Sequence, residues 1–351
     1  MPSLYKSVGS AGLGYPDIGQ TFYLVDTNYR TAAQGWTQSD HTGPLDLWAE
    51  KNPGRVFYGA GAGSGTGVGN QYASDSAAVQ AAVDAMVDYR GDTLFWTPGN
   101  YSLGTAIAVN VPAARWLGTA YKSPKYGCSP AVRNTTITAT VADVFADGAT
   151  TTMDNMEVAY LNFVPLTAED IWNLSVVQNG LHFHDFIFDT VSVATSAATQ
   201  FLVSAGLTTQ CLFDNFSWFS IAPQGPVFEV DVPSNLVLSN FFHSHYSTGG
   251  TYAASLLDVT GATADSVSLI GGRGQVSVGA GAGAVTALVT LAAQTASTTV
   301  LSVFDFRGSI GYATASTLIT TAGDAGEVDL SDCWISVIKG GAGGQGTAYT
   351  G

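Results

Sequence analysis

The chain has few charged residues, and most of those are acidic. Only 11% of its 351 residues are Asp, Glu, Lys or Arg, against about 25% in ordinary domains. It has 12 Lys and Arg and 27 Asp and Glu, which gives a net charge of -15. A protein that binds nucleic acid needs a basic stripe for the phosphates, and an anionic membrane repels an acidic chain. The composition therefore argues against nucleic acid and membranes as partners.

The sequence also lacks long apolar runs and a cysteine framework. No stretch of 18 apolar residues is present to span a bilayer, and the segment Met1–Lys6 lacks the apolar core of a signal peptide. The three cysteines, Cys128, Cys211 and Cys333, are far apart and odd in number, so we expect buried free thiols. The glycine-rich stretch 59–70 has no Lys-Ser/Thr pair of a phosphate-binding loop. We therefore expect no cofactor.

A short phrase recurs in the second half of the sequence. It consists of an apolar residue, a spacer, a small, acidic or amide residue, and another apolar residue close behind. Subtracting each starting position from the next gives spacings of 25, 30, 25, 31, 34 and 27 residues. A period of 20–50 residues made of strands without helices predicts a parallel β-helix, whose rungs stack about 4.8 Å apart. The copies start at Val158, Phe183, Phe213, Leu238, Leu269, Val303 and Leu330.

The third position of this phrase is rich in Asp and Asn. Because these residues tolerate the left-handed backbone of a tight turn, we expect the third positions to stack at one corner of the coil. A turn ladder is one interpretation of this column, and an active site is the other. The residues concerned are Asp185, Asn215, Asn240, Asp305 and Asp332.

A helix followed by a strand precedes the repeats. The segment Ser74–Ala85 predicts a helix capped by Ser74 or Asp75, with Val79, Val83, Met86 and Val87 as its apolar stripe. The strand that follows contains Pro98-Gly99-Asn100-Tyr101. This region resembles the entry segment of pectate-lyase-like right-handed β-helix proteins, in which such a helix precedes a strand ending in Pro-Gly-x-Tyr. The resemblance implies an all-β, single-stranded, right-handed parallel β-helix with an N-terminal capping helix.

The composition divides the chain into four parts. Residues 1–58 hold scattered aromatic residues among turn formers, too little for a core of their own, so we expect an extended anchoring arm. Residues 59–70 are a glycine-rich linker, residues 71–340 form the β-helix, and residues 341–351 are a flexible glycine-rich tail.

Two kinds of site are candidates on this scaffold. Asp305 and Asp332 share a register in adjacent copies, so their carboxyl groups are candidates for a catalytic pair. Arg273 and Arg307 both lie four residues past a repeat start and form a cationic column, which either binds an acidic sugar or only neutralises Asp305 and its neighbours.

Four of the five histidines form His-x-His pairs, which place two rings on one face of a strand, as metal ligands require. The pairs do not share a register, so one joint site is not expected. A three-fold axis would gather His243 and His245 from three chains into a metal site. The other pair is His182 and His184.

The resemblance implies several functions, because the family includes polysaccharide lyases and hydrolases, phage tailspikes and non-catalytic fibre or capsid-surface proteins. We expect a structural protein of a phage virion, a head decoration, spike or fibre, in which the arm binds other virion proteins. The charge-poor surface and the resemblance favour a homotrimer. A glycan-cleaving tailspike is the alternative, as is an adhesin that binds a host glycan through aromatic residues, although we expect most of these aromatic residues in the core instead. The adhesin candidates are Phe216, Trp218, Phe219, Phe241 and Phe242.

Overall fold

The computed structural model is mostly β, with three long parallel sheets. Where the chain is described, its single helix is α3, Ser76–Asp84. The structure describes residues 56–59, 71–72, 76–84, 86–96, 99–119, 135–139, 141, 143–148, 152–166, 170–190, 200–220, 226–247, 255–278, 287–293, 300–312, 317–321, 327–339 and 347–350.

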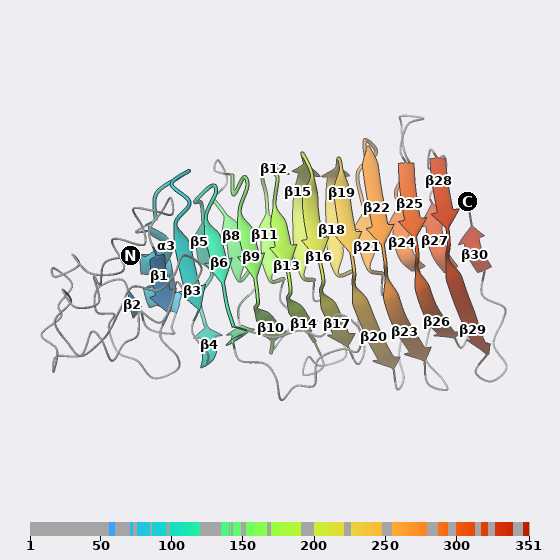
Figure 1. Cartoon of the computed structure of the whole chain (residues 1–351), viewed down its shortest axis with the longest axis horizontal. Coiled ribbons are helices and arrows are strands. Elements are labelled where there is room, and N and C mark those ends of the chain that lie inside the picture. The colour runs from blue at the N-terminus through green and yellow to red at the C-terminus, as the bar shows by residue number, and fades with distance from the viewer. Residues whose placement is uncertain are drawn as a thin grey trace, which may run out of the picture.

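The chain visits the three sheets, here called A, B and C, in turn. One circuit, here called a rung, gives one strand to each sheet, and that strand pairs in parallel with the equivalent strands of the rungs before and after it. Figure 1 shows the strands of each sheet side by side along the long axis of the molecule. The backbone groups of an inner strand thus find their partners in the rungs before and after it, which is why one rung alone is not stable.

The strand bounds are as follows. Sheet A contains β2 (Gln71–Tyr72), β1 (Val56–Gly59), β3 (Thr93–Trp96), β6 (Arg115–Leu117), β9 (Glu157–Ala159), β13 (His182–His184), β16 (Cys211–Asp214), β19 (Leu236–Ser239), β22 (Ser266–Ile270), β25 (Val300–Phe304) and β28 (Glu327–Ser331). Sheet B contains β4 (Gly99–Leu103), β7 (Thr135–Ala139), β10 (Asn162–Pro165), β14 (Ile187–Asp189), β17 (Ser217–Ser220), β20 (Phe242–Ser247), β23 (Arg273–Val278), β26 (Arg307–Tyr312) and β29 (Trp334–Lys339). Sheet C contains β5 (Ile107–Val109), β8 (Phe145–Asp147), β11 (Trp172–Leu174), β15 (Leu202–Thr208), β18 (Phe228–Pro233), β21 (Leu257–Val259), β24 (Ala287–Leu291), β27 (Thr317–Thr321) and β30 (Thr347–Thr350), and the short β12 (Gln178–Asn179) also pairs with β15.

The repeat starts form one column in sheet A. Phe183 pairs with both Val158 and Phe213, and the same register continues through the remaining starts to Leu330. The starts from Val158 to Val303 are buried, so this column is part of the core. The predicted stacking of the seven copies is therefore confirmed.

Phenylalanine rings fill a second inward column, one residue past the turn position. The rings of Phe186 and Phe216 stack with centroids 5.0 Å apart, and those of Phe216 and Phe241 are 5.5 Å apart. The next position is Gly272, where an added Cβ would lie 2.4 Å from Phe241 Cζ and 2.7 Å from Phe306 Cδ2. A glycine is needed here because the rings of the rungs on either side, Phe241 and Phe306, close over the position.

Tryptophans fill the core of the earlier rungs. In the described part of the chain, the indole N–H groups of Trp96, Trp116 and Trp172 have no hydrogen-bond acceptor although they are buried. Aromatic neighbours surround them in edge-to-face geometry: Trp116 and Phe145 lie 5.2 Å apart at 76°, and Trp172 and Phe183 lie 5.1 Å apart at 89°. Contacts of an N–H edge with an aromatic face partly compensate a missing acceptor.

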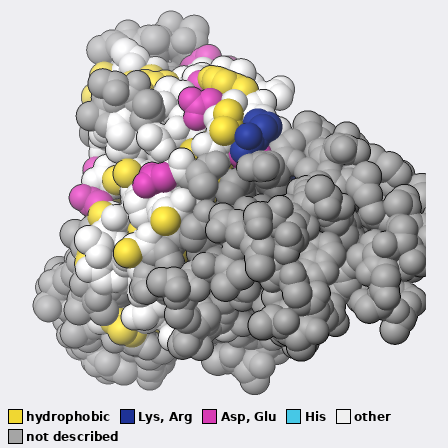
Figure 2. Space-filling view, turned by 90° about the vertical axis from the view of Figure 1, so that its left-hand side faces the viewer, with side chains coloured by type: hydrophobic (Ala, Val, Ile, Leu, Met, Phe, Trp, Pro, Cys, Tyr) yellow, Lys and Arg dark blue, Asp and Glu magenta, His cyan; other side chains and the backbone are white. Residues whose placement is uncertain are grey.

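Helix α3 packs on the first rungs, where it contacts β5, β2 and β1. Its buried residues include Val79 and Val83, and Met86 just beyond the helix is buried too, as predicted. Val87 is exposed, so its assignment to the apolar stripe was wrong, because the helix ends at Asp84 and the periodicity does not continue. Figure 2 looks at this end of the molecule, where hydrophobic, acidic and basic side chains form small separate groups among the coloured residues.

Two strands lie in segments to which the sequence assigned no strand. β1 covers the end of the predicted arm and Gly59 of the predicted linker, and it pairs with β3 of sheet A. β30 lies in the predicted tail and pairs with β27 of sheet C. Residues 1–55 and most of the predicted linker lie outside the described residues. The boundaries of the arm, linker and tail remain predictions.

Connection lengths differ between the corners. From β9 onward, two residues always join sheet A to sheet B, for example between β9 and β10. Over the same rungs, the connections from sheet B to sheet C vary, from four residues between β26 and β27 to twelve between β14 and β15. The corner from A to B is thus the one part of the rung with a constant length, and this explains why its sequence repeats.

Candidate functional site

The corner between sheets A and B is a continuous ladder of left-handed residues. The third position of every repeat copy has a positive φ, between 50° and 67°. The backbone N–H groups of these third-position residues donate to carbonyl oxygens of the following rung. Examples are Asp185 N to Asp214 O (3.1 Å) and Asn215 N to Ser239 O (3.0 Å). The predicted turn ladder is therefore confirmed. Its members are Tyr160, Asp185, Asn215, Asn240, Gly271, Asp305 and Asp332.

Side chains reinforce this ladder from rung to rung. The Asn215 amide donates to Asp185 Oδ1, and Asn240 Nδ2 donates to Asp214 Oδ1 at 2.9 Å. Ser239 Oγ also donates to Asp214 Oδ1, at 2.6 Å. These carboxylates bind the next rung, so their oxygens stabilise the corner.

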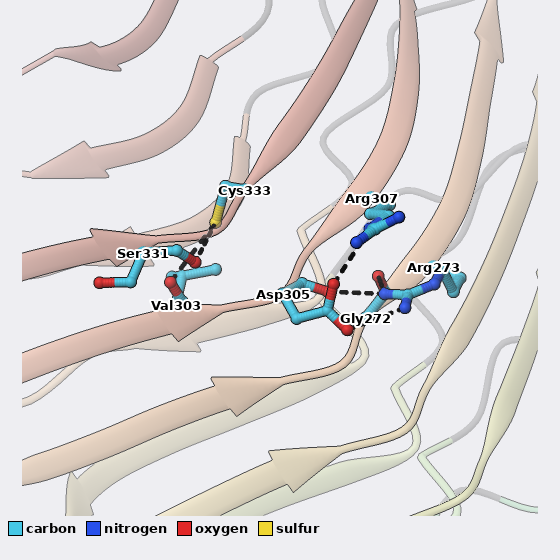
Figure 3. A network of polar contacts seen from close by, with 7 residues as sticks. All are labelled: Gly272, Arg273, Val303, Asp305, Arg307, Ser331 and Cys333. Atoms are coloured by element: carbon cyan, nitrogen blue, oxygen red, sulfur yellow. Dashed lines mark hydrogen bonds and ion pairs between the residues drawn. The ribbon is translucent and has the colours of Figure 1, made fainter.

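Asp305 is held between the two predicted arginines, as Figure 3 shows. Arg273 Nη2 lies 2.9 Å from Asp305 Oδ2, and Arg307 Nε lies 3.0 Å from Asp305 Oδ1. Arg273 Nη1 also donates to the backbone oxygens of Gly272 and Asp305. Hydrogen bonds from Arg273, and then from Arg307, lower the pKa of Asp305 below its usual range. The geometry thus matches the interpretation in which the arginines neutralise Asp305.

The second predicted carboxylate, Asp332, takes no part in this network. Figure 3 draws the residues that precede and follow it in the chain, Ser331 and Cys333, and the Cys333 thiol donates to Ser331 O and Val303 O at 3.4 Å each. The carboxylate of Asp305, its expected partner, has both oxygens bound to arginines instead. An ionised, doubly bound carboxylate is a poor general acid, because it has no proton to donate near neutral pH.

A second charged cluster lies on the outer face of sheet A around His184. Nδ1 of this ring is 2.7 Å from Asp185 Oδ2, and Nε2 is 3.1 Å from Glu157 Oε1. The other oxygen of Glu157 accepts from Arg115 Nε at 2.6 Å. The cluster therefore connects β6, β9 and β13 along one line of contacts. The ring of Tyr160 packs edge-on against His184 at 5.5 Å.

The histidines of this cluster have different protonation behaviour. The rings of His182 and His184 lie on one face of β13 with centroids 4.5 Å apart, as the His-x-His pattern predicts. Hydrogen bonds to Asp185 and Glu157 raise the pKa of His184 to about 9, whereas burial and the neighbouring His184 lower the pKa of His182. Hydrogen bonds from His184 and Arg115 lower the pKa of Glu157 to about 2. Both shifts favour a charged His184 beside a charged Glu157 near neutral pH, an arrangement that suits an ion pair better than proton transfer.

We expect this cluster to make the free energy of unfolding fall as the pH rises above neutral. The folded pKa of His184, about 9, lies above its ordinary value of 6.5, so its contribution is complete below pH 6.5 and is lost as pH rises through about 9. The loss should be about 1 kcal/mol, because water screens a partly exposed pair. Urea unfolding between pH 6.5 and 9 measures it.

A His184→Gln variant is the control for this measurement, because it removes the titrating group. Its unfolding free energy should stay nearly constant across the same interval. An equal slope in both proteins would contradict the assignment. The interval avoids pH below 6.5, where protonation of His182, whose folded pKa is lowered, acts with the opposite sign.

The second His-x-His pair lies in β20. His243 pairs in register with the buried Trp218, and His245 pairs with Ser220. The side chains of this pair lie outside the described residues, so the proposed metal site is untested. Over the parts of the chain that can be searched, no group of three or more His, Cys, Asp or Glu is arranged to hold a metal ion.

The remaining predicted residues are mostly structural. Cys211 is a buried free thiol, as predicted, and Cys333 is free and half-buried. Of the adhesin candidates, Phe216, Trp218 and Phe241 are buried in the core. Cys128 lies outside the described residues. Helix α3, nine residues long, is too short to cross a bilayer, and the described residues offer no other helix that could.

The sequence interpretation missed the partners of His184. Glu157 and Arg115 precede it by 27 and 69 positions, and only the register of β6, β9 and β13 brings them together. It also missed a buried network around Asp147, which accepts from Ser175 and Gln178 of the following rung. The repeat period offers a signal for Glu157 alone, because it stacks β13 on β9. Arg115 and Asp147 precede the first repeat start, and Ser175 lies outside the strands.

Comparisons with family models, with curated proteins and with solved structures found no match for this chain.

Proposed function

We propose that this chain is a structural protein of a bacteriophage particle, a head decoration, spike or fibre. In this proposal residues 1–58 bind other virion proteins, and the stack projects from the particle as a shaft. The observation that supports it most is the unbroken register of sheet A from β1 to β28. A stack whose inner columns run without interruption is stiff, as a projecting shaft must be.

The proposal includes a specific form of the fold, the single-stranded right-handed parallel β-helix. Crossovers between parallel strands are right-handed in about 98% of cases, which favours this hand. In the same proposal α3 caps the N-terminal end, where its buried Val79, Ala82 and Val83 cover apolar groups of the first rungs.

We also propose that three copies associate in the particle. The chain has only 11% charged residues and 46% hydrophobic ones, a composition that suits a surface partly hidden by other chains. Assembly from the host cytoplasm into the virion needs no secretion.

Mass spectrometry and imaging of purified particles test the virion role. We expect this chain in gradient-purified particles of the virus that encodes it, at a fixed ratio to the major capsid protein. Antibody against the chain should label one defined region of the particle. Detection only in the soluble lysate, with unlabelled particles, would refute the proposal.

The exposed Arg307 and the half-buried Arg273 and Asp305 leave glycan cleavage as the second candidate, because arginines beside a carboxylate suit an acidic sugar. We expect no new reducing ends or unsaturated products when the full chain is incubated with bacterial surface polysaccharides. Product formation that Asp305→Asn abolishes and the exposed control Asp84→Asn in α3 retains would establish the enzyme instead.

A further inference from the structure

Large apolar side chains are exposed on both sides of the corner between sheets A and B in the last rungs. On the sheet A side, Ile270 and Phe304 are neighbours in register, and Phe304 is 46% exposed. On the sheet B side, Trp334 is 64% exposed and pairs in register with Arg307. Two rungs before Phe304, the same position holds Ser239. This outward column is therefore large and apolar at Ile270 and Phe304, between Ser239 before them and Ser331 after them.

The charges on the two sides of this corner are opposite. Glu327 and Asp329 are exposed on the sheet A side, in β28. Arg273 and Arg307 are on the sheet B side, with side chains 38% and 61% exposed. Asp305 lies at the turn between them and neutralises one of the two arginines. The exposed Asp332 lies at the same turn position of the next rung, so these two arginines and two aspartates balance, and Arg307 with its 61% exposed side chain is the cation that the sheet B side presents most openly.

We propose that this corner is the interface between copies of the chain, with the sheet A side of one copy docked on the sheet B side of the next. Phe304 and Ile270 then contact Trp334 of the neighbouring copy, and Asp329 and Glu327 face its arginines. The inference rests on the trimer proposed above. It goes further because it names the surface.

A second copy fits this surface better than an unrelated protein, because one chain carries both complementary halves within the same three successive rungs, those of β22, β25 and β28. An interface of two different patches closes into a ring when the rotation is right. Three such corners meeting about an axis parallel to the stack bring each sheet A side against the next sheet B side. Exposed Trp, Phe and Arg are also the side chains that dominate binding energy at protein interfaces.

Charge reversal tests the proposed pairing. The full chain is measured by sedimentation equilibrium, where wild type should have three times the 36.3 kDa mass of the chain. Arg307→Glu or Asp329→Arg alone should weaken association at least about tenfold, because each places like charges together. The double variant should restore the wild-type dissociation constant to within about threefold, since the pair is re-formed with reversed signs.

An apolar variant tests the same surface without changing charge. Phe304→Ser should also shift the chain toward monomer. Leu166→Ser is its control, since Leu166 is 44% exposed at the end of β10 and lies outside the patch. Far-UV circular dichroism checks that each variant is folded, and Arg307→Gln replaces Arg307→Glu if the latter is not.

The outcomes separate the interface from the trimer itself. A wild-type trimer that Phe304→Ser and both single reversals leave intact would overturn the interface but retain the trimer. A monomeric wild type would overturn both, yet it would not remove the chain from purified particles, which the virion test measures separately. Loss of association in each single variant with rescue in the double variant supports the interface.

Discussion

Replacing Phe216 by alanine should lower the free energy of unfolding by about 3–5 kcal/mol. This ring is fully buried, stacks between Phe186 and Phe241, and contacts Phe228 at 5.5 Å. Its removal leaves a cavity within a column whose neighbours are held by the backbone register and cannot move in to fill it. Urea unfolding followed by tryptophan fluorescence measures the loss.

Two further variants make this result specific to burial and volume. Phe216→Leu should cost less than Phe216→Ala, because more of the cavity remains filled. Leu166→Ala removes an exposed apolar side chain and should change the unfolding free energy by about 0.5 kcal/mol or less. Equal effects at Phe216 and Leu166 would contradict a core role for the stacked rings.

Replacing Asp147 by alanine should cost about 2–4 kcal/mol, because it leaves the buried Gln178 amide and three partly buried donors of Ser175 and Val176 without their acceptor. Its carboxylate accepts from Ser175 N at 2.9 Å, Ser175 Oγ at 2.7 Å, Val176 N at 2.8 Å and Gln178 Nε2 at 2.8 Å. Gln178 is itself fully buried and donates to Val176 O. The same unfolding experiment measures the change.

The matched control for Asp147 is Asp84→Ala at the end of α3. Asp84 is exposed and accepts one hydrogen bond, from Gln80, so its loss should be about 0.5 kcal/mol or less. Asp147→Asn should fall between the two, because its amide group turns one acceptor into a donor facing other donors. If Asp147→Ala unfolds as easily as Asp84→Ala, the buried network contributes little to stability.

The sequence predicts the corner between sheets A and B well because two constraints act there together. The connection length is constant, and a left-handed turn restricts most third positions to Asp, Asn or Gly, as at Asn215, Asn240 and Gly271. The corner from sheet C to sheet A also has left-handed residues, Asn155 and Gln210 among them, yet the sequence analysis did not find it. The residue types at the corner from sheet C to sheet A differ from rung to rung, so no single residue type marks this corner in the sequence.

The charged clusters were harder to predict because the direction in which a side chain points matters as well as the register of its strand. Register alone placed Asp305 beside Asp332, but the side chain of Asp305 meets Arg273 and Arg307 instead. The arginines were correctly paired with each other in the column, and their contact with Asp305 was one of the two interpretations left open. For His184, the pattern placed its ring beside that of His182 but gave no sign of Glu157.

The constant corner and the variable connections also suggest how the chain can be engineered. The connection from sheet B to sheet C already differs in length by eight residues between two rungs. Segments added to this connection therefore need not change the register of the strands in the sheets. A foreign epitope grafted into one such connection would be displayed at a chosen height, and grafts in several connections would be spaced by multiples of the distance between strands. The molecule can thus serve as a scaffold that presents peptides at defined distances from one another.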